Sequence, residues 1–518
     1  KYVVQCQSAD LEDCLDECAV NVLKVEIAMD GNRDDEIKFD DPNDTKYLFW
    51  VNDDIDVISG GKEDDKKSGT PNCNDNVITC KRDLEDFTRL HIRMDNNTAN
   101  LSGITYWMKF ENSISGSPSV NIFEAINQNL DYIKNDSIAD QQIQKKKIIT
   151  VGSSEEQLPS QYIKTGDQVS PFILEGKTAG KADLTIIVKV DGNDVCKKAV
   201  QLDLRPISEF CQEFVASITS DDNVSTTVSQ DGTYTYTPEK DEYVLYVHGW
   251  RMADWEKDRW TETVFKRLWW QGYKGHVGGF QWPTLGLQRP YNQSELRAWN
   301  SAQALKNLIT SLNSSYPGQV RVIAHSMGNV VVGEALRLCS SSVVHTHLAA
   351  QAALPAHCYD NTISNYWSNF RTPNVYGYYT SGQFPDVPYL AGNSSKADNL
   401  VQYYNARDYA LRKWEFNNRN FKPDRLNKYH YTEGDANVDT YAPASGDRFY
   451  YQESLITQRT MVFPVNRYEI FARSAQSRSR ALGCESSVAG FGIHRNLQGF
   501  DYNDSSYSHS REFRGCTT

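Results

Sequence analysis

The chain has 518 residues, of which 39% are hydrophobic and 23% charged, so it is long enough for roughly three domains with hydrophobic cores. The formal net charge of −13 argues against a nucleic-acid-binding protein, because such a protein needs a basic face to neutralise phosphates. No stretch approaches the roughly 20 apolar residues of a membrane-spanning helix, so we expect no transmembrane segment.

The cysteines and the start of the chain predict a secreted protein. The chain begins at Lys1, as expected of a processed mature form, and carries glycosylation sequons at Asn96, Asn100 and Asn393. Its 11 cysteines include no Cys-x-x-Cys pair and no zinc-finger spacing. Three pairs that are close in sequence predict local disulfides, with scattered buried thiols as the alternative: Cys73/Cys80, Cys196/Cys211 and Cys339/Cys358.

Residues 1–207 have the patterning of β modules. Apolar and polar residues alternate over 22–29, 90–94 and 104–110, as expected for half-buried strands. The runs 182–190 and 199–204 flank the turn Asp191-Gly192-Asn193, which predicts a β-hairpin. We therefore expect a β-sandwich domain over 1–120 and an immunoglobulin-like β domain over 121–207. The Ser/Thr/Asp-rich stretch that follows predicts a linker over 208–240.

An acidic loop near the N-terminus is a candidate calcium site. Oxygen-bearing side chains alternate there in a pattern similar to the start of an EF-hand loop, with candidate ligands Asp30, Asn32, Asp34, Glu36 and Asp41. Asp35 stands where that loop needs its glycine, and Asp41 replaces the bidentate glutamate. A solvated acidic turn is therefore the alternative interpretation.

From residue 241 onward the pattern alternates between strands and helices. Continuous apolar runs predict strands at 243–247, 276–281 and 320–324. Helical spacing follows each of them, at 259–272, 295–312 and 327–338. Such alternation predicts an α/β domain over 241–518, with a mostly parallel sheet and helices on both faces.

The most informative motif is A-x-S-x-G around Ser326, a variant of the nucleophile elbow of α/β folds. A strand pattern ends at Ala324 and a helix pattern begins at Met327. The turn between them is so tight that Ala324 and Gly328 must be small, and it raises the serine hydroxyl above the C-terminal edge of the sheet. At the N-terminus of the helix, the Met327 N–H is expected to face a developing oxyanion.

Three motifs together make the last ~280 residues resemble bacterial α/β-hydrolases of an esterase-like, poorly characterised family. They are His248-Gly249-Trp250, Gln281-Trp282-Pro283 and the A-H-S-M-G-N run at 324–329, each at the end of an expected strand. The resemblance implies that the loop after His248 supplies a second oxyanion amide, from Trp250 or Arg251. His248 itself is also consistent with a core histidine that bonds loop carbonyls.

The resemblance implies a triad in the chain order serine, acid, histidine. For the acid, Asp408 follows a strand pattern at 400–405 and matches the family's N-x-x-D-Y element, with Asp386 and Asp398 as alternatives. For the base, His509 matches the family's H-S-x-x-F element, with His494 and His430 as alternatives. Three further histidines precede the acid and are expected to be structural: His345, His347 and His357.

These features predict a secreted serine hydrolase that cleaves carboxylic esters through an acyl-enzyme and requires no cofactor. Its substrate would be a small-molecule or lipid-like ester, and the N-terminal β modules would serve self-association or attachment to a cell surface. Esterase, lipase, thioesterase and amidase share the same residues, so the sequence does not separate them. The alternative is an extracellular structural, adhesive or filament-forming subunit whose hydrolase domain is mainly architectural.

Overall fold

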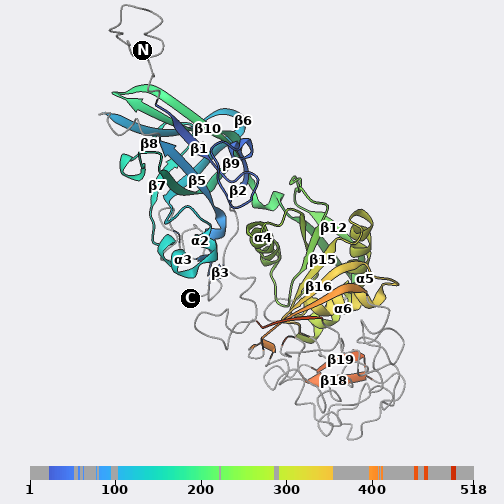
Figure 1. The fold of residues 1–518 in the computed structure, drawn as a ribbon. Coiled ribbons are helices and arrows are strands. Elements are labelled where there is room, and N and C mark those ends of the chain that lie inside the picture. Colours follow the sequence, from blue (N-terminus) through green and yellow to red (C-terminus); the bar gives the residue numbers. More distant parts are fainter. Residues whose placement is uncertain are drawn as a thin grey trace, which may run out of the picture. The chain divides into compact units, whose positions relative to one another are not determined.

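The structure is a computed structural model, and it describes residues 23–51, 57–58, 62–63, 78, 81–94, 103–220, 223–284, 291–353, 396–405, 408, 410–411, 448–452, 460–464, 483 and 492–496. The contacts divide the chain into one compact unit over Lys1–Ile207 and a second over Ser208–Thr517 (Figure 1). No helix in these described ranges combines the length and the apolarity needed to cross a membrane.

The first unit is built on one sheet of eight described strands. Its path runs β1 (Val25–Ala28), β5 (Phe87–Met94), β9 (Val169–Val190), β10 (Asn193–Pro206) and β2 (Lys46–Val51). The long strand β6 (Ile104–Glu124) pairs with β9 and with the short strands β7 (Lys147–Val151) and β8 (Glu156–Leu158). Outside this sheet lie helices α2 (Asp131–Lys134) and α3 (Asp136–Gln142) and a small hairpin of β3 (Val57–Ile58) and β4 (Lys62–Glu63).

The predicted hairpin is confirmed, but the predicted division at residue 120 is wrong. Strands β9 and β10 pair antiparallel around Asp191 and Gly192, which both have positive φ, as a tight hairpin turn requires. Strand β6 crosses residue 120 without interruption and pairs with β9 along nearly its whole length. Its middle section is exposed and polar, which hides the continuity of the strand from the apolar pattern. The unit is therefore continuous across this boundary, and a separate immunoglobulin-like domain is not confirmed.

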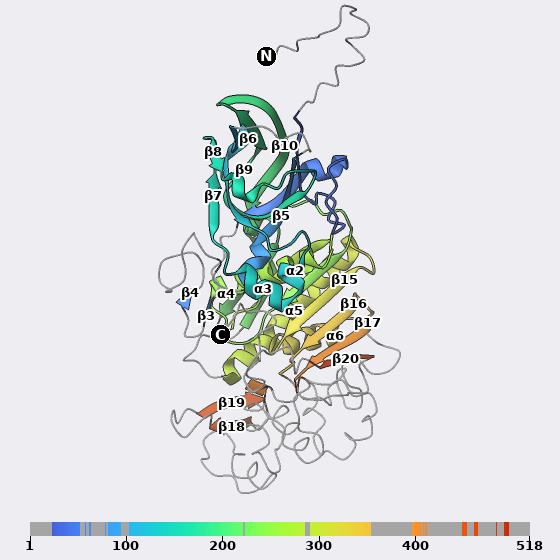
Figure 2. The same ribbon diagram turned by 60° about the vertical axis from the view of Figure 1, so that its left-hand side comes forward.

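The second unit contains the predicted α/β sheet. The order of its eight described strands is β12 (Asn223–Asp231), β11 (Gln212–Ser220), β14 (His276–Gln281), β13 (Tyr243–Val247), β15 (Val320–His325), β16 (Val344–Ala350), β17 (Ala397–Tyr404) and β20 (Ile493–Asn496). All neighbours are parallel except β11 and β12. Figure 2 shows the last four strands side by side. A separate antiparallel pair joins β18 (Arg448–Gln452) to β19 (Thr460–Pro464).

The predicted linker over 208–240 is also wrong. Its residues supply β11 and β12, and β11 pairs parallel with β14, from Gln212 opposite Gly278 to Val215 opposite Gln281. Strand β12 lies at the edge of the sheet, and most of its side chains are half-buried or exposed. An edge strand can be rich in Ser and Thr because one side of it faces water, so its composition is close to that of a linker.

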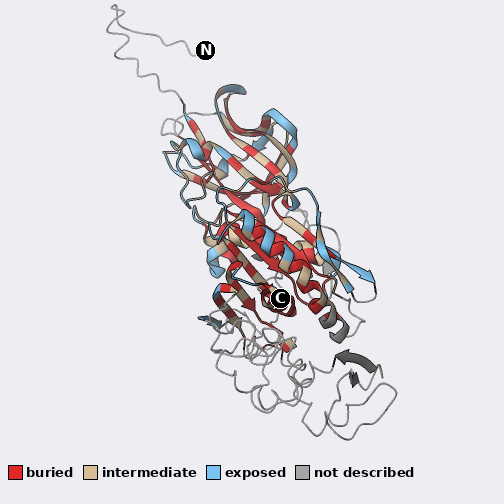
Figure 3. Cartoon of the chain, turned by 90° about the vertical axis from the view of Figure 1, so that its right-hand side faces the viewer, coloured by how far each residue is buried: buried red, intermediate tan, exposed pale blue. Residues whose placement is uncertain are grey.

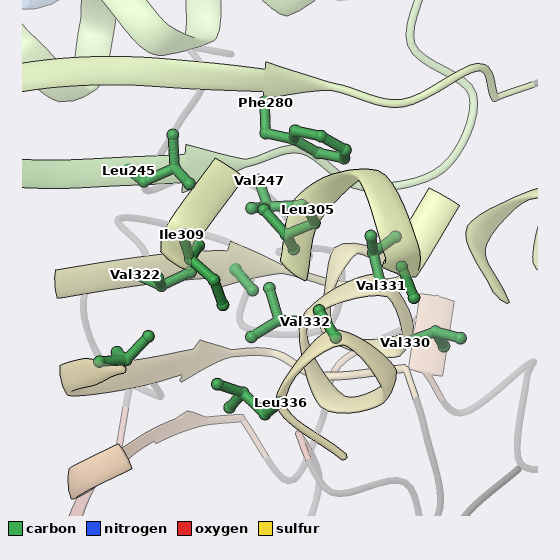
Figure 4. Packing of buried hydrophobic residues seen from close by; sticks show 14 of the residues in the cluster. Leu245, Val247, Phe280, Leu305, Ile309, Val322, Val330, Val331, Val332 and Leu336 are labelled. Carbon is green, nitrogen blue, oxygen red and sulfur yellow. The ribbon is translucent and has the colours of Figure 1, made fainter. Parts of the chain in front are cut away.

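Helices cover both faces of this sheet, as predicted. On one face α5 (Tyr291–Ser315) and α6 (Gly328–Leu338) pack on Leu245, Val247 and Val322, as Figure 4 shows. Val244 and Tyr246 point to the other face, the side of α4 (Asp254–Trp270), and are buried as well. Burial on both faces explains the continuous apolar runs, and Figure 3 shows buried residues concentrated along the strands.

Candidate active site

Ser326 lies on the predicted strand–turn–helix, directly after β15 and two residues before α6 begins. Its φ is 50°, in the left-handed region that non-glycine residues rarely adopt. Its own N–H donates to the Ala350 carbonyl at 3.0 Å, and its carbonyl accepts the Ala353 N–H at 3.1 Å. The backbone is thus bonded on both sides of the strained residue, as expected of a nucleophile elbow. The residue is only 5% exposed.

The small residues around the serine are required by close backbone contacts. A Cβ atom on Gly328 would lie 2.5 Å from both the Val247 and the His248 carbonyl oxygens. A Cβ atom on Gly249 would lie 3.0 Å from the Ser326 Cβ. The two glycines therefore let the end of β13 and the start of α6 meet at the serine.

Asn329 belongs to the predicted motif, but the sequence assigns it no role. The side chain is fully buried, and its amide donates to the carbonyls of Ala324 at 2.9 Å and Ser326 at 3.1 Å. Its oxygen lies 3.3 Å from Nε2 of His347, a fully buried histidine of β16. Burial lowers the pKa of His347 to about 3, so the ring is neutral and donates to Asn329. His347 therefore has the structural surroundings expected of it.

His345 lies on the same strand with Nδ1 2.8 Å from the Thr346 hydroxyl, and His357 lies outside the described residues.

The two candidate oxyanion segments both reach the serine, but they are not equivalent. The Met327 amide follows Ser326 at the start of α6. The Arg251 N–H donates to the Thr284 hydroxyl at 3.1 Å, and Arg251 has a φ of 65°. This bond uses the Arg251 amide, so the geometry favours Trp250 as the second donor. The Trp250 indole N–H is bonded to the Ser294 hydroxyl of α5 at 3.0 Å.

His248 anchors the turn that carries these amides. Its Nε2 accepts the Trp282 backbone N–H at 3.1 Å, so the ring proton lies on Nδ1, which donates to the Gly249 carbonyl at 2.8 Å. The rings of His248 and Trp282 stack with their centroids 5.3 Å apart, and the Trp282 indole N–H donates to the His248 carbonyl. Burial lowers the pKa of His248 to about 3, which keeps the ring neutral. The core role of His248 is thus compatible with a catalytic role for the neighbouring backbone.

Asp408 lies four residues beyond the end of β17 and is completely buried. Its Oδ2 accepts the Gln351 side-chain amide at 2.7 Å, and its Oδ1 accepts the Leu411 N–H at 2.9 Å. The alternative Asp398 is exposed at the start of β17, at the edge of the sheet opposite Ser326, and accepts the Ser342 hydroxyl. The alternative Asp386 lies outside the described residues.

One short segment connects the serine to the acid. Ala350 and Ala353 bond the Ser326 backbone, and Gln351 between them bonds Asp408. The C-terminal ends of three adjacent parallel strands thereby meet at one edge of the sheet, where ligands bind in open α/β folds. Gln351 was not predicted from the sequence, and its one signal is its place directly after a buried strand.

The three candidate bases are described to different extents. His494 lies within β20, where its backbone pairs with Gln402 of β17. His430 and His509 lie outside the described residues, so the assignment of the base stays a prediction.

The acidic loop of the first unit is connected by an ion pair and by hydrogen bonds of its own side chains. Asp30 forms a buried ion pair with Arg89 at 2.6 Å and accepts the N–H groups of Asp34 and Asp35. The Asn32 amide donates to Asp34 and Asp41, and Asp34 accepts the Glu36 N–H. Among the described residues, no group of three or more His, Cys, Asp or Glu side chains is placed to hold a metal. The calcium loop and the acidic turn stay alternative predictions.

The described cysteines do not form the predicted disulfides. Cys196, Cys211 and Cys339 all carry thiols, which contradicts the pairs Cys196/Cys211 and Cys339/Cys358. Burial raises the pKa of the Cys211 and Cys339 thiols, so both are protonated, in keeping with the alternative of buried thiols. The pair Cys73/Cys80 lies outside the described residues.

One protein-family model matches part of the second unit. Residues 235–351 match the family model described as "Alpha/beta hydrolase of unknown function (DUF900)". No curated protein matches the chain.

Three of the solved structures that resemble parts of the chain are hydrolases. An esterase from Pyrococcus furiosus is 16% identical with a TM-score of 0.21, and the match covers 38% of this chain and 72% of that chain. A hyperthermophilic esterase from Pyrobaculum calidifontis is 14% identical with a TM-score of 0.18, and the match covers 33% of this chain and 59% of that chain. A puromycin-hydrolyzing peptidase from Mycobacterium tuberculosis is 12% identical with a TM-score of 0.23, and the match covers 46% of this chain and 37% of that chain. TM-scores this low support no conclusion about this chain.

Proposed function

We propose that the unit over Ser208–Thr517, in which residues 235–351 match a family model of α/β-hydrolases, is a serine hydrolase that cleaves carboxylic esters. The observation that carries the proposal is the left-handed backbone of Ser326 on a strand–turn–helix, tied to a buried Asp408 through residues 350–353. Such strain persists only where surrounding structure holds it, and it is concentrated at functional sites.

The proposed reaction begins at the serine hydroxyl. His509 takes the proton of the Ser326 Oγ as this oxygen attacks the ester carbonyl, and a tetrahedral oxyanion forms. The amides of Met327 and Trp250 donate to that oxyanion. The intermediate collapses to an acyl-enzyme, and the alcohol leaves with the proton from the histidine. Water, activated by the same histidine, then releases the carboxylic acid and restores the serine.

Asp408 is proposed as the acid because its position and burial suit that role. A carboxylate in this place holds the imidazole tautomer and stabilises the imidazolium formed during attack. Burial strengthens this electrostatic effect because water does not screen it. His509 enters through the family resemblance, and His494 is the alternative base. The mechanism requires no metal ion or cofactor.

An active-site label tests the proposal directly. Because Ser326 is only 5% exposed, the first probe is a small one, diisopropyl fluorophosphate, followed by hydrolysis of p-nitrophenyl acetate. We expect stoichiometric labelling of the native protein and none of Ser326→Ala. Ser301→Ala, at a buried helical serine of α5, is the matched control and should label normally. Loss of labelling in His509→Ala but not in His494→Ala would support the assigned base.

The absence of labelling in a folded native protein would contradict the proposal. It would support instead the architectural role, in which the hydrolase fold serves assembly.

The extracellular location and the attachment role of the first unit remain proposals. The thiols of Cys196, Cys211 and Cys339 remove part of the disulfide argument, so the location now rests mainly on the glycosylation sequons.

A further inference from the structure

Asp408 is bonded by a side chain that does not belong to the predicted triad, that of Gln351. A carboxylate that is removed from water must receive hydrogen bonds, since an unpaired buried charge is very costly. Asp408 is 0% exposed, and the shorter of its two side-chain bonds, 2.7 Å, comes from the amide of Gln351. The other bond comes from a backbone N–H, that of Leu411. Gln351 therefore holds the acid through its side-chain amide.

The backbone of Gln351 is itself tightly held. Its φ is 41°, a left-handed value, directly after β16 ends at Ala350. Its N–H donates to the Tyr403 carbonyl near the end of β17 at 2.9 Å. A Cβ atom on Gly483 would lie 2.4 Å from the Gln351 carbonyl carbon, so another segment packs closely against this turn. Gln351 therefore presents its amide from a rigid, strained position.

The same turn also holds the serine. The carbonyl before Gln351, that of Ala350, accepts the Ser326 N–H, and two residues later the Ala353 N–H donates to the Ser326 carbonyl. A displacement of this turn would consequently move the serine and the acid together. The side chain of Gln351 acts separately from this backbone, because its amide donates to Asp408.

We propose that Gln351 is a positioning residue for the acid of the triad. The inference rests on the proposed function and specifies how its acid is oriented. The neutral amide donor fixes the rotation of the Asp408 carboxyl group. It bonds Oδ2, and the Leu411 N–H bonds Oδ1, so the two oxygens of the carboxyl group are held by different donors. Gln351 is not itself expected to touch the substrate.

Two substitutions separate positioning from a simple packing role. Gln351→Met keeps the size of the side chain and removes the donor. Gln351→Glu keeps the shape and donates only when protonated, because an ionised glutamate is an acceptor that repels Asp408. Gln142→Met is the matched control: Gln142 is also fully buried and donates its amide, to the Glu124 carbonyl, in the other unit.

The readout is the second-order rate of labelling by diisopropyl fluorophosphate, measured from pH 5 to pH 9 together with the circular dichroism of each variant. We expect Gln351→Met to label about 100-fold more slowly than the native protein, as for a catalytic group displaced by about 1 Å. For Gln351→Glu we expect the rate relative to native protein to fall as the pH rises. Gln142→Met should label at the native rate at every pH.

The outcomes separate the proposed function from the proposed role of Gln351. A native protein that does not label contradicts the proposed function. A native protein that labels, beside folded Gln351 variants with the native rate and pH profile, overturns the role of Gln351. Two further results would overturn the role of Gln351, because each indicates structural support only. One is a labelling rate that is reduced by the same factor at every pH in both Gln351 variants. The other is loss of the fold in both Gln351 variants while Gln142→Met stays folded.

Discussion

At Ser326 an unfavourable backbone conformation is balanced by hydrogen bonds. A left-handed φ costs a non-glycine residue roughly 1–2 kcal/mol. Four hydrogen bonds act on the backbone of this residue. One comes from the Ser326 N–H, and three reach its carbonyl, from the Ala353 N–H, the Asn329 N–H and the Asn329 side-chain amide. At about 1 kcal/mol each, these bonds are large enough to offset the strain. His347 holds the Asn329 oxygen, so a histidine one strand away supports the elbow.

The neutral state of His347 predicts a pH dependence of stability. Burial lowers its pKa to about 3 in the folded protein, while the unfolded chain has the ordinary value near 6.5. As the pH falls from 6.5 toward 3, only the unfolded state takes up this proton, so stability is lost, by up to about 1.4 kcal/mol per pH unit. His347→Gln should therefore lose stability less steeply than the native protein between pH 6.5 and pH 4.

Urea unfolding at several pH values measures this slope. Thr346→Val, on the same strand, removes no ionisable group and should shift the stability without changing the slope. Identical slopes for His347→Gln and the native protein would contradict a buried, neutral His347.

At the level of elements, the position of α6 is set by how closely it approaches β13. Gly328 begins the helix and lies against the carbonyls of Val247 and His248 at the end of the strand. The apolar face of α6, with Val331 and Leu336, then packs on the sheet beside α5, as Figure 4 shows. The helix N-terminus, and with it the Met327 amide, is therefore located by backbone contact rather than by side chains.

Gly328→Ala is expected to push helix α6 away from strand β13. The new Cβ atom would lie 2.5 Å from two backbone oxygens, which cannot rotate away. We expect a loss of about 1–3 kcal/mol in the free energy of unfolding, as for an overpacked core, together with slower labelling of Ser326. Gly492→Ala is the control, because no atom lies within 4 Å of its added Cβ. Native-like labelling and stability in Gly328→Ala would refute this account of the elbow.

At the level of the whole molecule, the chain contains two compact units with separate cores. The core of the first unit includes Trp50, whose indole N–H donates to the buried Asp86 at 2.8 Å. The core of the second unit lies between its sheet and the helices α5 and α6. Units with their own cores are expected to unfold separately.

Calorimetry of the full chain is therefore expected to show two unfolding transitions. Asp86→Ala removes the acceptor of the Trp50 indole, and an unsatisfied buried donor costs about 1–3 kcal/mol. We expect one transition to move to a lower temperature while the other, and the labelling of Ser326, stay unchanged. A single transition that moves as a whole would show that the two units unfold cooperatively.

The sequence by itself determined the features that depend on neighbouring residues. Apolar runs and helical spacing indicated the alternating strands and helices of the second unit, and a small-residue motif placed Ser326 between a strand and a helix. These succeed because backbone sterics and one-sided or two-sided burial act over a few residues at a time. The same reasoning placed Asp408 after a strand, where the structure has it.

Only the tertiary structure decided which distant groups meet. Gln351 bonds Asp408 across 57 residues, and Arg251 donates its amide to Thr284 across 33, and neither bond leaves a periodic signal in the sequence. The edge strand β12, its neighbour β11 and the continuous strand β6 were missed for a related reason. Their exposed polar residues are typical of linkers, and only the pairing with other strands makes them part of a sheet.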